Sequence, residues 1–99
     1  MAERRKLLLA KLKEVCDRIE KILATSDVTL ADMNMPHEVD GKDPPLERLQ
    51  HFRTILNDAL KELQRGEARV CNKCRVELSA VALDETPWAT HCVECAAPS

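Results

Sequence analysis

The sequence predicts a mainly α-helical protein: an antiparallel two-helix coiled-coil hairpin with a long acidic tip loop, followed by a small knuckle domain built on four cysteines. Three observations support this prediction. Apolar residues recur at alternating spacings of three and four in two segments, an acidic and proline-containing stretch separates those segments, and two Cys-x2-Cys pairs lie near the C-terminus. We assign residues 1–68 to the hairpin and residues 69–99 to the cysteine domain.

The first helix is predicted over residues 2–25. Apolar residues follow one another there at spacings of 4, 3, 4 and 3, which is the seam of a helix that packs against a partner helix. Neither glycine nor proline interrupts the segment. The seam consists of Leu8, Leu12, Val15, Ile19 and Ile22.

The tip loop is predicted over residues 26–45. Five acidic residues and only Lys42 as a base give residues 27–45 a net charge of −4. A short further turn through Leu30 and Met33 has to end at Pro36. Connections between helices usually have ~2–8 residues, so this longer one is either a linker without a role of its own or the functional end of the hairpin. The candidate partner-binding residues at this tip are Asp40, Asp43 and Glu47.

The second helix is predicted over residues 46–66. It follows Asp43-Pro44-Pro45, where proline suits a first helical turn and the Asp43 side chain can cap the helix. Arg65-Gly66 is typical of a helix end. At 1.5 Å per residue, each helix spans roughly 30–35 Å. The apolar seam continues at spacings of three and four through Leu49, Phe52, Leu56, Ala59 and Leu63.

Four cysteines form the most specific motif. Cys71 and Cys74 make one Cys-x2-Cys pair, and Cys92 and Cys95 make another, with seventeen residues between the pairs. This spacing is the signature of a structural zinc site, because each pair can turn both sulfurs toward one ion at about 2.3 Å. Four thiolates leave no open coordination position, so one Zn²⁺ would hold structure without activating water. A disulfide or redox pair is the alternative, as is a mixed site in which His91 replaces one thiolate.

The segment between the two pairs is predicted to be irregular. Val76-Glu77-Leu78 and residues 80–83 can form two short strands, or one strand and a loop. Pro87 ends this run, and Trp88 is expected to pack against the base of the hairpin. The chain ends four residues after Cys95, so a C-terminal helix can only be a stub.

Composition argues against several classes of function. The charge is spread without a concentrated basic face, so direct sequence-specific DNA binding is not expected. The three histidines are scattered, and a chain with two glycines contains no P-loop or dinucleotide loop, so we do not expect an enzyme.

The lengths of the apolar stretches indicate where in the cell the protein is expected. No stretch reaches the ~20 apolar residues of a membrane span, and Leu7 to Ala10 is too short for the core of a secretory signal. We therefore expect a cytoplasmic protein without membrane contact, in which reduced thiols favour metal binding. The fifth cysteine, Cys16, is either a half-buried helix residue or a reactive thiol. The hairpin pattern favours a monomer.

Residues 56–95 resemble the DksA/TraR family of bacterial regulators, which bind RNA polymerase. Members carry the same two cysteine pairs at the same interval, and Val76-Glu77-Leu78 stands where many have Val-Glu-Ile. Arg75 departs from the family, which usually has glycine there, and Ala68-Arg69 replaces a usual Tyr-Gly. Other positions that match the family are Gly66, Leu83, Pro87, Ala89 and the apolar helix residues Leu56, Leu60 and Leu63.

The resemblance implies a transcription regulator that inserts its helical hairpin into the secondary channel of RNA polymerase and modulates initiation. The best-known members carry an Asp-x-x-Asp-x-Ala tip motif. In this chain Asp43 keeps the first position, whereas Leu46 and Arg48 replace the second Asp and the Ala. The altered tip leaves an alternative: a zinc-scaffolded adaptor that binds another protein partner, with polymerase control lost or changed.

Overall fold

The protein is described from a computed structural model that covers residues 2–25, 30, 33, 35–36 and 38–96. Two long helices, α1 (Ala2–Thr25) and α2 (Pro45–Arg65), precede two short ones, α3 (Ala80–Glu85) and α4 (Val93–Ala96). The described residues contain no extended strand, only an isolated antiparallel bridge between Val70 and Glu77. None of the helices in these ranges is long and apolar enough to cross a membrane.

Helix α1 has the bounds that the sequence predicted. Its seam residues Leu8, Val15 and Ile19 are buried, and Leu12 and Ile22 pack against the same core while partly exposed. Salt bridges beside the seam link the half-buried Glu14 carboxylate to Lys11 at 3.0 Å and to Arg18 at 3.4 Å. The apolar spacing therefore identified the buried face of α1 correctly.

Helix α2 begins one residue earlier and ends one residue earlier than predicted. Pro44 occupies the N-cap position and no side chain caps the helix, so the predicted Asp43 cap is wrong. A proline pair starts the helix because its fixed φ suits the first turn and the missing N–H has no helical acceptor there. At the other end, Gly66 adopts the left-handed conformation (φ 74°), and the Glu67 N–H donates to the Glu62 carbonyl at 2.9 Å.

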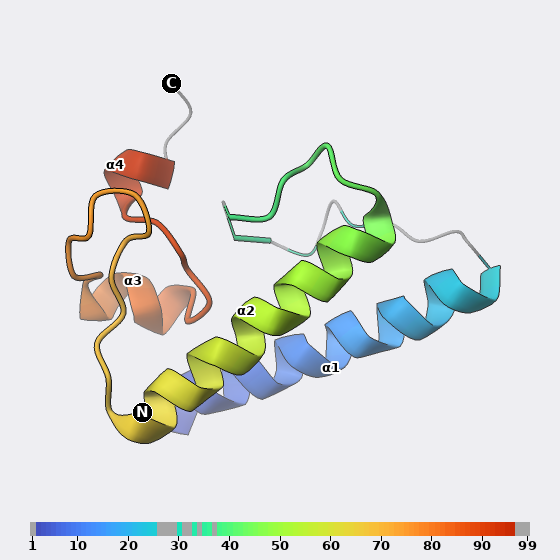
Figure 1. The fold of residues 1–99 in the computed structure, drawn as a ribbon. Coiled ribbons are helices and arrows are strands. Elements are labelled where there is room, and N and C mark those ends of the chain that lie inside the picture. Colours follow the sequence, from blue (N-terminus) through green and yellow to red (C-terminus); the bar gives the residue numbers. More distant parts are fainter. Residues whose placement is uncertain (1, 26–29, 31–32, 34, 37, 97–99) are drawn as a thin grey trace.

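The two long helices lie side by side and run in opposite directions (Figure 1). Their contact buries the α1 seam against Leu49, Phe52, Ile55, Leu56 and Ala59 of α2. The Phe52 ring is fully buried and meets Trp88 edge to face, with ring centroids 5.9 Å apart. Trp88 packs on the helix pair as predicted, but against residues well inside α1 and α2 and not at the base: the Lys11 ammonium lies 5.2 Å from the centre of its ring.

The connection between α1 and α2 differs from the expected tip at the far end of a rod. Met33 is fully buried in the core of the helix pair, and Leu30, Met35 and Val39 pack against that core. The Met33 N–H donates to the Leu30 carbonyl at 3.1 Å, as a further turn through these two residues would require. Burial of these apolar side chains draws the connection back along the helices. Residues 26–29, 31–32, 34 and 37 of the predicted tip lie outside the described residues.

The region between the cysteine pairs corrects the strand prediction. Residues 80–83 form most of helix α3 instead of a strand or a loop. The Ser79 hydroxyl caps this helix by accepting a hydrogen bond from the Ala82 N–H at 3.1 Å. A capped apolar run can bury Leu83 on one side of a helical turn, where it joins Leu78 and Cys71 in a second small core.

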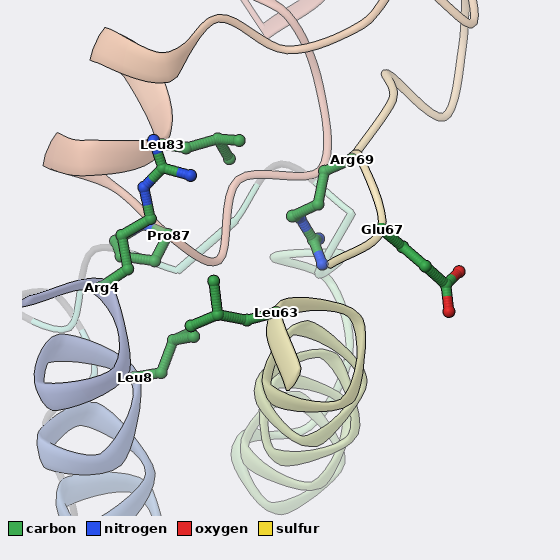
Figure 2. Close-up of a pocket in the computed structure, with 7 residues that line it drawn as sticks. All are labelled: Arg4, Leu8, Leu63, Glu67, Arg69, Leu83 and Pro87. Carbon is green, nitrogen blue, oxygen red and sulfur yellow. The ribbon is translucent and has the colours of Figure 1, made fainter. Parts of the chain in front are cut away.

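Polar contacts join this region to the ends of the long helices. The Arg4 guanidinium of α1 bonds to the Asp84 carboxylate at 2.6 Å, and Arg69 pairs with Glu62 of α2 and donates to the Ala89 carbonyl at 2.9 Å. Figure 2 shows the small cavity at this junction, about 30 Å³ in volume, lined by Leu8 and Leu63 from the two long helices. A cavity of this size holds little more than water.

Candidate metal centre

Short backbone turns position the four cysteines. Cys71 and Cys74 lie in the turn enclosed by the Val70–Glu77 bridge, where the Arg75 N–H donates to the Cys71 carbonyl at 3.0 Å. Cys95 lies on α4, and Cys92 directly precedes that helix. The start of α4 therefore presents the sulfurs of Cys92 and Cys95 to the turn that contains Cys71 and Cys74.

The four sulfur atoms converge as the sequence predicted. All lie within 4.8 Å of one another, and the Sγ atoms of Cys74 and Cys92 are 3.6 Å apart. A disulfide needs ~2.05 Å between its sulfurs, so this separation is that of free thiols. Cys71 is buried, Cys74 is exposed, and Cys92 and Cys95 lie between these extremes. Such a group of four thiols can hold one metal ion.

Hydrogen bonds to sulfur prepare Cys71 to ionise. Burial alone raises the pKa of its thiol, but backbone N–H groups of Cys74, Cys92 and Lys73 outweigh it and lower the pKa to about 5. Two of these donors lie 3.5 Å (Cys74) and 3.4 Å (Lys73) from the Cys71 sulfur. The Cys71 side chain is therefore a thiolate near pH 7 even without a cation.

The pKa values of Cys74 and Cys95 are raised, in contrast to that of Cys71. The neighbouring Cys92 side chain, together with burial and the Cys71 charge, raises the pKa of Cys95 to about 12. For Cys74, a hydrogen bond from the Val76 backbone lowers the pKa, but burial and the thiols of Cys71 and Cys92 outweigh it and the pKa is raised. Four sulfurs this close cannot all carry a negative charge unless a cation lies among them.

Arg75 shows how tightly the first turn is wound. Its φ of 66° makes it the non-glycine residue with positive φ in the described part of the chain. A side chain with a Cβ atom is strained in this region, and glycine is not. The position directly after the second cysteine therefore has the geometry that favours glycine.

His91 lies outside the group of thiols. Its Nδ1 atom is 2.9 Å from the Thr90 hydroxyl, and its Nε2 atom lies 3.9 Å from the Glu38 carboxylate. Within the described residues, the group able to hold a metal consists of the four cysteines alone. Cys16 is half-buried on α1 and is not a member of it.

The three acidic residues predicted at the tip do not form a metal group. Asp40 and Asp43 share one turn, in which the Asp43 N–H donates to the Asp40 carbonyl at 3.1 Å. The Asp40 carboxylate accepts a hydrogen bond from the Lys42 N–H at 2.9 Å. Glu47 is exposed in the first turn of α2. These carboxylates lie in the turn before α2 and in its first turn, and none belongs to the group of four cysteines able to hold a metal.

Contacts between the connection and the cysteine region were not predicted. The Glu38 N–H donates to the Thr90 hydroxyl at 3.3 Å, and the Asn72 side-chain amide donates to the Glu38 carboxylate at 3.3 Å. These partners are 52 and 34 residues apart in sequence, and no local pattern links residues at such separations.

The chain matches no family model, no curated protein and no solved structure.

Proposed function

We propose that this protein is a zinc-containing transcription regulator that binds RNA polymerase, inserting the pair α1 and α2 as a coiled-coil hairpin into the secondary channel to modulate initiation. The observation that carries the proposal is the convergence of Cys71, Cys74, Cys92 and Cys95 in a region that packs on two long helices. These elements and their order are those that the resemblance to DksA/TraR regulators implies.

Zinc is the metal that the donor set favours. Four thiolates at about 2.3 Å from one ion in a tetrahedron have their sulfurs about 3.8 Å apart. The 3.6 Å between the Cys74 and Cys92 sulfurs is close to that edge, so a small inward movement of the most distant sulfurs completes the shell. The ion would hold the two turns together and, with its shell closed, would not activate water.

Local geometry supports the family resemblance at two positions that the motif itself does not fix. Gly66 has a φ of 74° and Arg75 a φ of 66°. The first matches a family glycine, and the second occupies the place where the family usually has one. Positive φ at both positions is the conformation that glycine adopts without strain, so the backbone here agrees with the glycines of the family.

The helix pair has the reach that the proposed mechanism needs. Its helices contain 24 and 21 residues, so at 1.5 Å per residue they are roughly 36 and 31 Å long. Glu47 lies in the first turn of α2 and Asp43 in the turn that precedes it, at the end of the pair where the connection enters α2. In a channel, two carboxylates at that end would act on a cationic surface or on a catalytic magnesium ion through charge, without contact to DNA bases.

Competition for polymerase tests the proposal. Zinc-loaded protein carrying a fluorescent label should bind bacterial RNA polymerase, and an unlabelled secondary-channel binder should displace it. Absence of binding at micromolar polymerase, with one zinc per chain confirmed, would contradict the proposal.

The adaptor alternative rests on the connection. Because Met33 is buried in the core and Glu38 bonds to the cysteine region, part of the acidic segment lies along the helices and away from the tip. A zinc-scaffolded adaptor for another protein partner would need no projecting acidic tip.

Removal of the tip charges separates the two readings. The double variant Asp43→Ala, Glu47→Ala should lose the effect on initiation if the tip acts in the channel, whereas an adaptor would retain its binding. Asp58→Ala is the matched control, since Asp58 is an exposed acid on the same helix away from its start.

A further inference from the structure

We infer that Glu38, Asn72 and Thr90 form a latch that couples metal occupancy of the four-cysteine site to the position of the acidic connection. The inference rests on metal binding, which is one part of the proposed function, and is independent of polymerase. In the metal-loaded protein the latch holds the connection against the helix pair. Loss of the metal releases it.

The latch consists of two hydrogen bonds that cross between distant parts of the chain. The Glu38 backbone N–H donates to the Thr90 hydroxyl, and the Glu38 carboxylate accepts from the Asn72 amide, each at 3.3 Å. Glu38 thus contacts both segments that carry a cysteine pair, and its carboxylate also lies 3.9 Å from the Nε2 atom of His91 in the second segment. Thr90 is buried (4% exposed), so the hydroxyl that accepts the Glu38 N–H is shielded from competing water.

Both latch partners are fixed by the turns that position the sulfurs. Asn72 lies between Cys71 and Cys74, and Thr90 lies two residues before Cys92. A further hydrogen bond joins them directly, from the Asn72 N–H to the Thr90 carbonyl at 2.9 Å. An ion bound by both cysteine pairs therefore sets the spacing between Asn72 and Thr90, and without it this spacing depends on a few hydrogen bonds and the small core of Cys71, Leu78 and Leu83.

The connection responds to the latch because it is only partly held by burial. Met33 is fully buried, but Val39 is partly exposed and residues 40–42 are exposed. Beyond the latch, this stretch retains local turn contacts, such as the Val39 N–H to the Pro36 carbonyl at 3.0 Å. Opening the latch therefore frees residues 38–43, which include Asp40 and Asp43, while Met33 stays in the core.

Hydrogen–deuterium exchange of residues 38–43 tests the latch. With zinc bound, Glu38→Ala and Asn72→Ala should each speed exchange in this segment by about threefold, the effect of losing one exposed contact to a charged group. Glu85→Ala, which removes an exposed acid of α3 outside the latch, should leave exchange unchanged. Metal analysis and circular dichroism confirm that each variant keeps its zinc and its helices.

Removal of zinc from the wild-type protein with a chelator tests the coupling. Exchange at residues 38–43 should rise at least to the level of the Glu38→Ala variant, which keeps the backbone hydrogen bond to Thr90, while residues 49–59 of α2 remain protected. Equal exchange in Glu38→Ala and Glu85→Ala would overturn the latch. Unchanged exchange at 38–43 after zinc removal, or a chain that binds no zinc, would overturn the coupling. None of these readouts involves polymerase, so failure of polymerase binding leaves the inference standing.

Discussion

The helix pair and the cysteine region bury very different amounts of apolar surface. In the described part of the chain, the core around α1 and α2 contains ten buried residues, including Phe52 and Trp88, whereas the core of the cysteine region contains Cys71, Leu78 and Leu83. Apolar burial stabilises a protein by roughly 25 cal/mol per Å², so the helix pair has a driving force of its own. The cysteine region has short elements and a small core, and it depends on its metal.

The protein therefore consists of two regions that are stabilised differently, one by apolar burial and the other by metal binding, and a few specific contacts join them. Trp88 inserts from the cysteine region into the core of the helix pair, and Arg4 and Arg69 bridge the same junction. Loss of metal should therefore disorder one region while the other persists.

Loss of a ligand should have a large effect on the cysteine region. Cys71→Ser replaces the most buried thiolate by a hydroxyl and should weaken zinc binding by about a hundredfold or more, since structural zinc sites derive ~10–16 kcal/mol from four ligands. Cys16→Ser should leave the affinity unchanged, because Cys16 lies outside the cluster. Competition with a chromophoric chelator measures both. Equal affinities for the two variants would contradict the assigned ligand set.

Truncation of a core side chain should destabilise the helix pair. Phe52→Ala empties a fully buried site against Trp88 and should cost about 3–5 kcal/mol in the free energy of unfolding. Arg53→Ala, an exposed neighbour on α2, should change stability by less than about 0.5 kcal/mol. Urea denaturation followed by circular dichroism measures both. A loss for Phe52→Ala no larger than for Arg53→Ala would mean that this core does not stabilise the pair.

Zinc affinity should fall as pH falls. In the metal-free site near pH 7, Cys71 is already a thiolate because its pKa is about 5, whereas Cys74 and Cys95 hold their protons because their pKa values are raised. Zinc displaces at least these two protons, so its association constant should rise by about a hundredfold per pH unit there. Titrations at neighbouring pH values measure the slope. A constant that does not vary with pH would contradict ligation by these thiols.

The smallest effect concerns the first turn of the cysteine region. Arg75→Gly removes a side chain from a backbone with φ 66° and should stabilise the metal-loaded region by up to about 1 kcal/mol. Arg75→Ala retains a Cβ atom and should bring no such gain. Thermal unfolding of the zinc-loaded variants compares them. If Arg75→Ala stabilised the protein as much as Arg75→Gly, the cause would be loss of the arginine charge and not relief of backbone strain.

The sequence predicted what depends on local periodicity and spacing. Alternating spacings of three and four identified both long helices within a residue, and the two Cys-x2-Cys pairs identified the thiols that converge. Helix α3 was missed because a four-residue apolar run fits a strand as well as a helix. Its N-cap, Ser79, was a signal that could have decided between them.

The path of the connection could not be predicted for a different reason. Its acidic residues suggested a solvated tip, but Met33 and Val39 alternate with them and pack on the helices. The contact between Glu38 and Thr90 spans 52 residues, so it depends on how the cysteine region docks and not on any local pattern. The predicted tip acids Asp40, Asp43 and Glu47 could be placed in turns and helix ends from the sequence, but their distance from the cysteines could not.

Hydrogen–deuterium exchange across the whole chain, with and without zinc, tests directly whether the metal stabilises the cysteine region while apolar burial stabilises the helix pair. The account predicts that a chelator removes protection from residues 69–96 and from 38–43, while the buried positions of α1 and α2 remain protected. Loss of protection in all segments together, or in none of them, would show that the metal does not divide the molecule in this way.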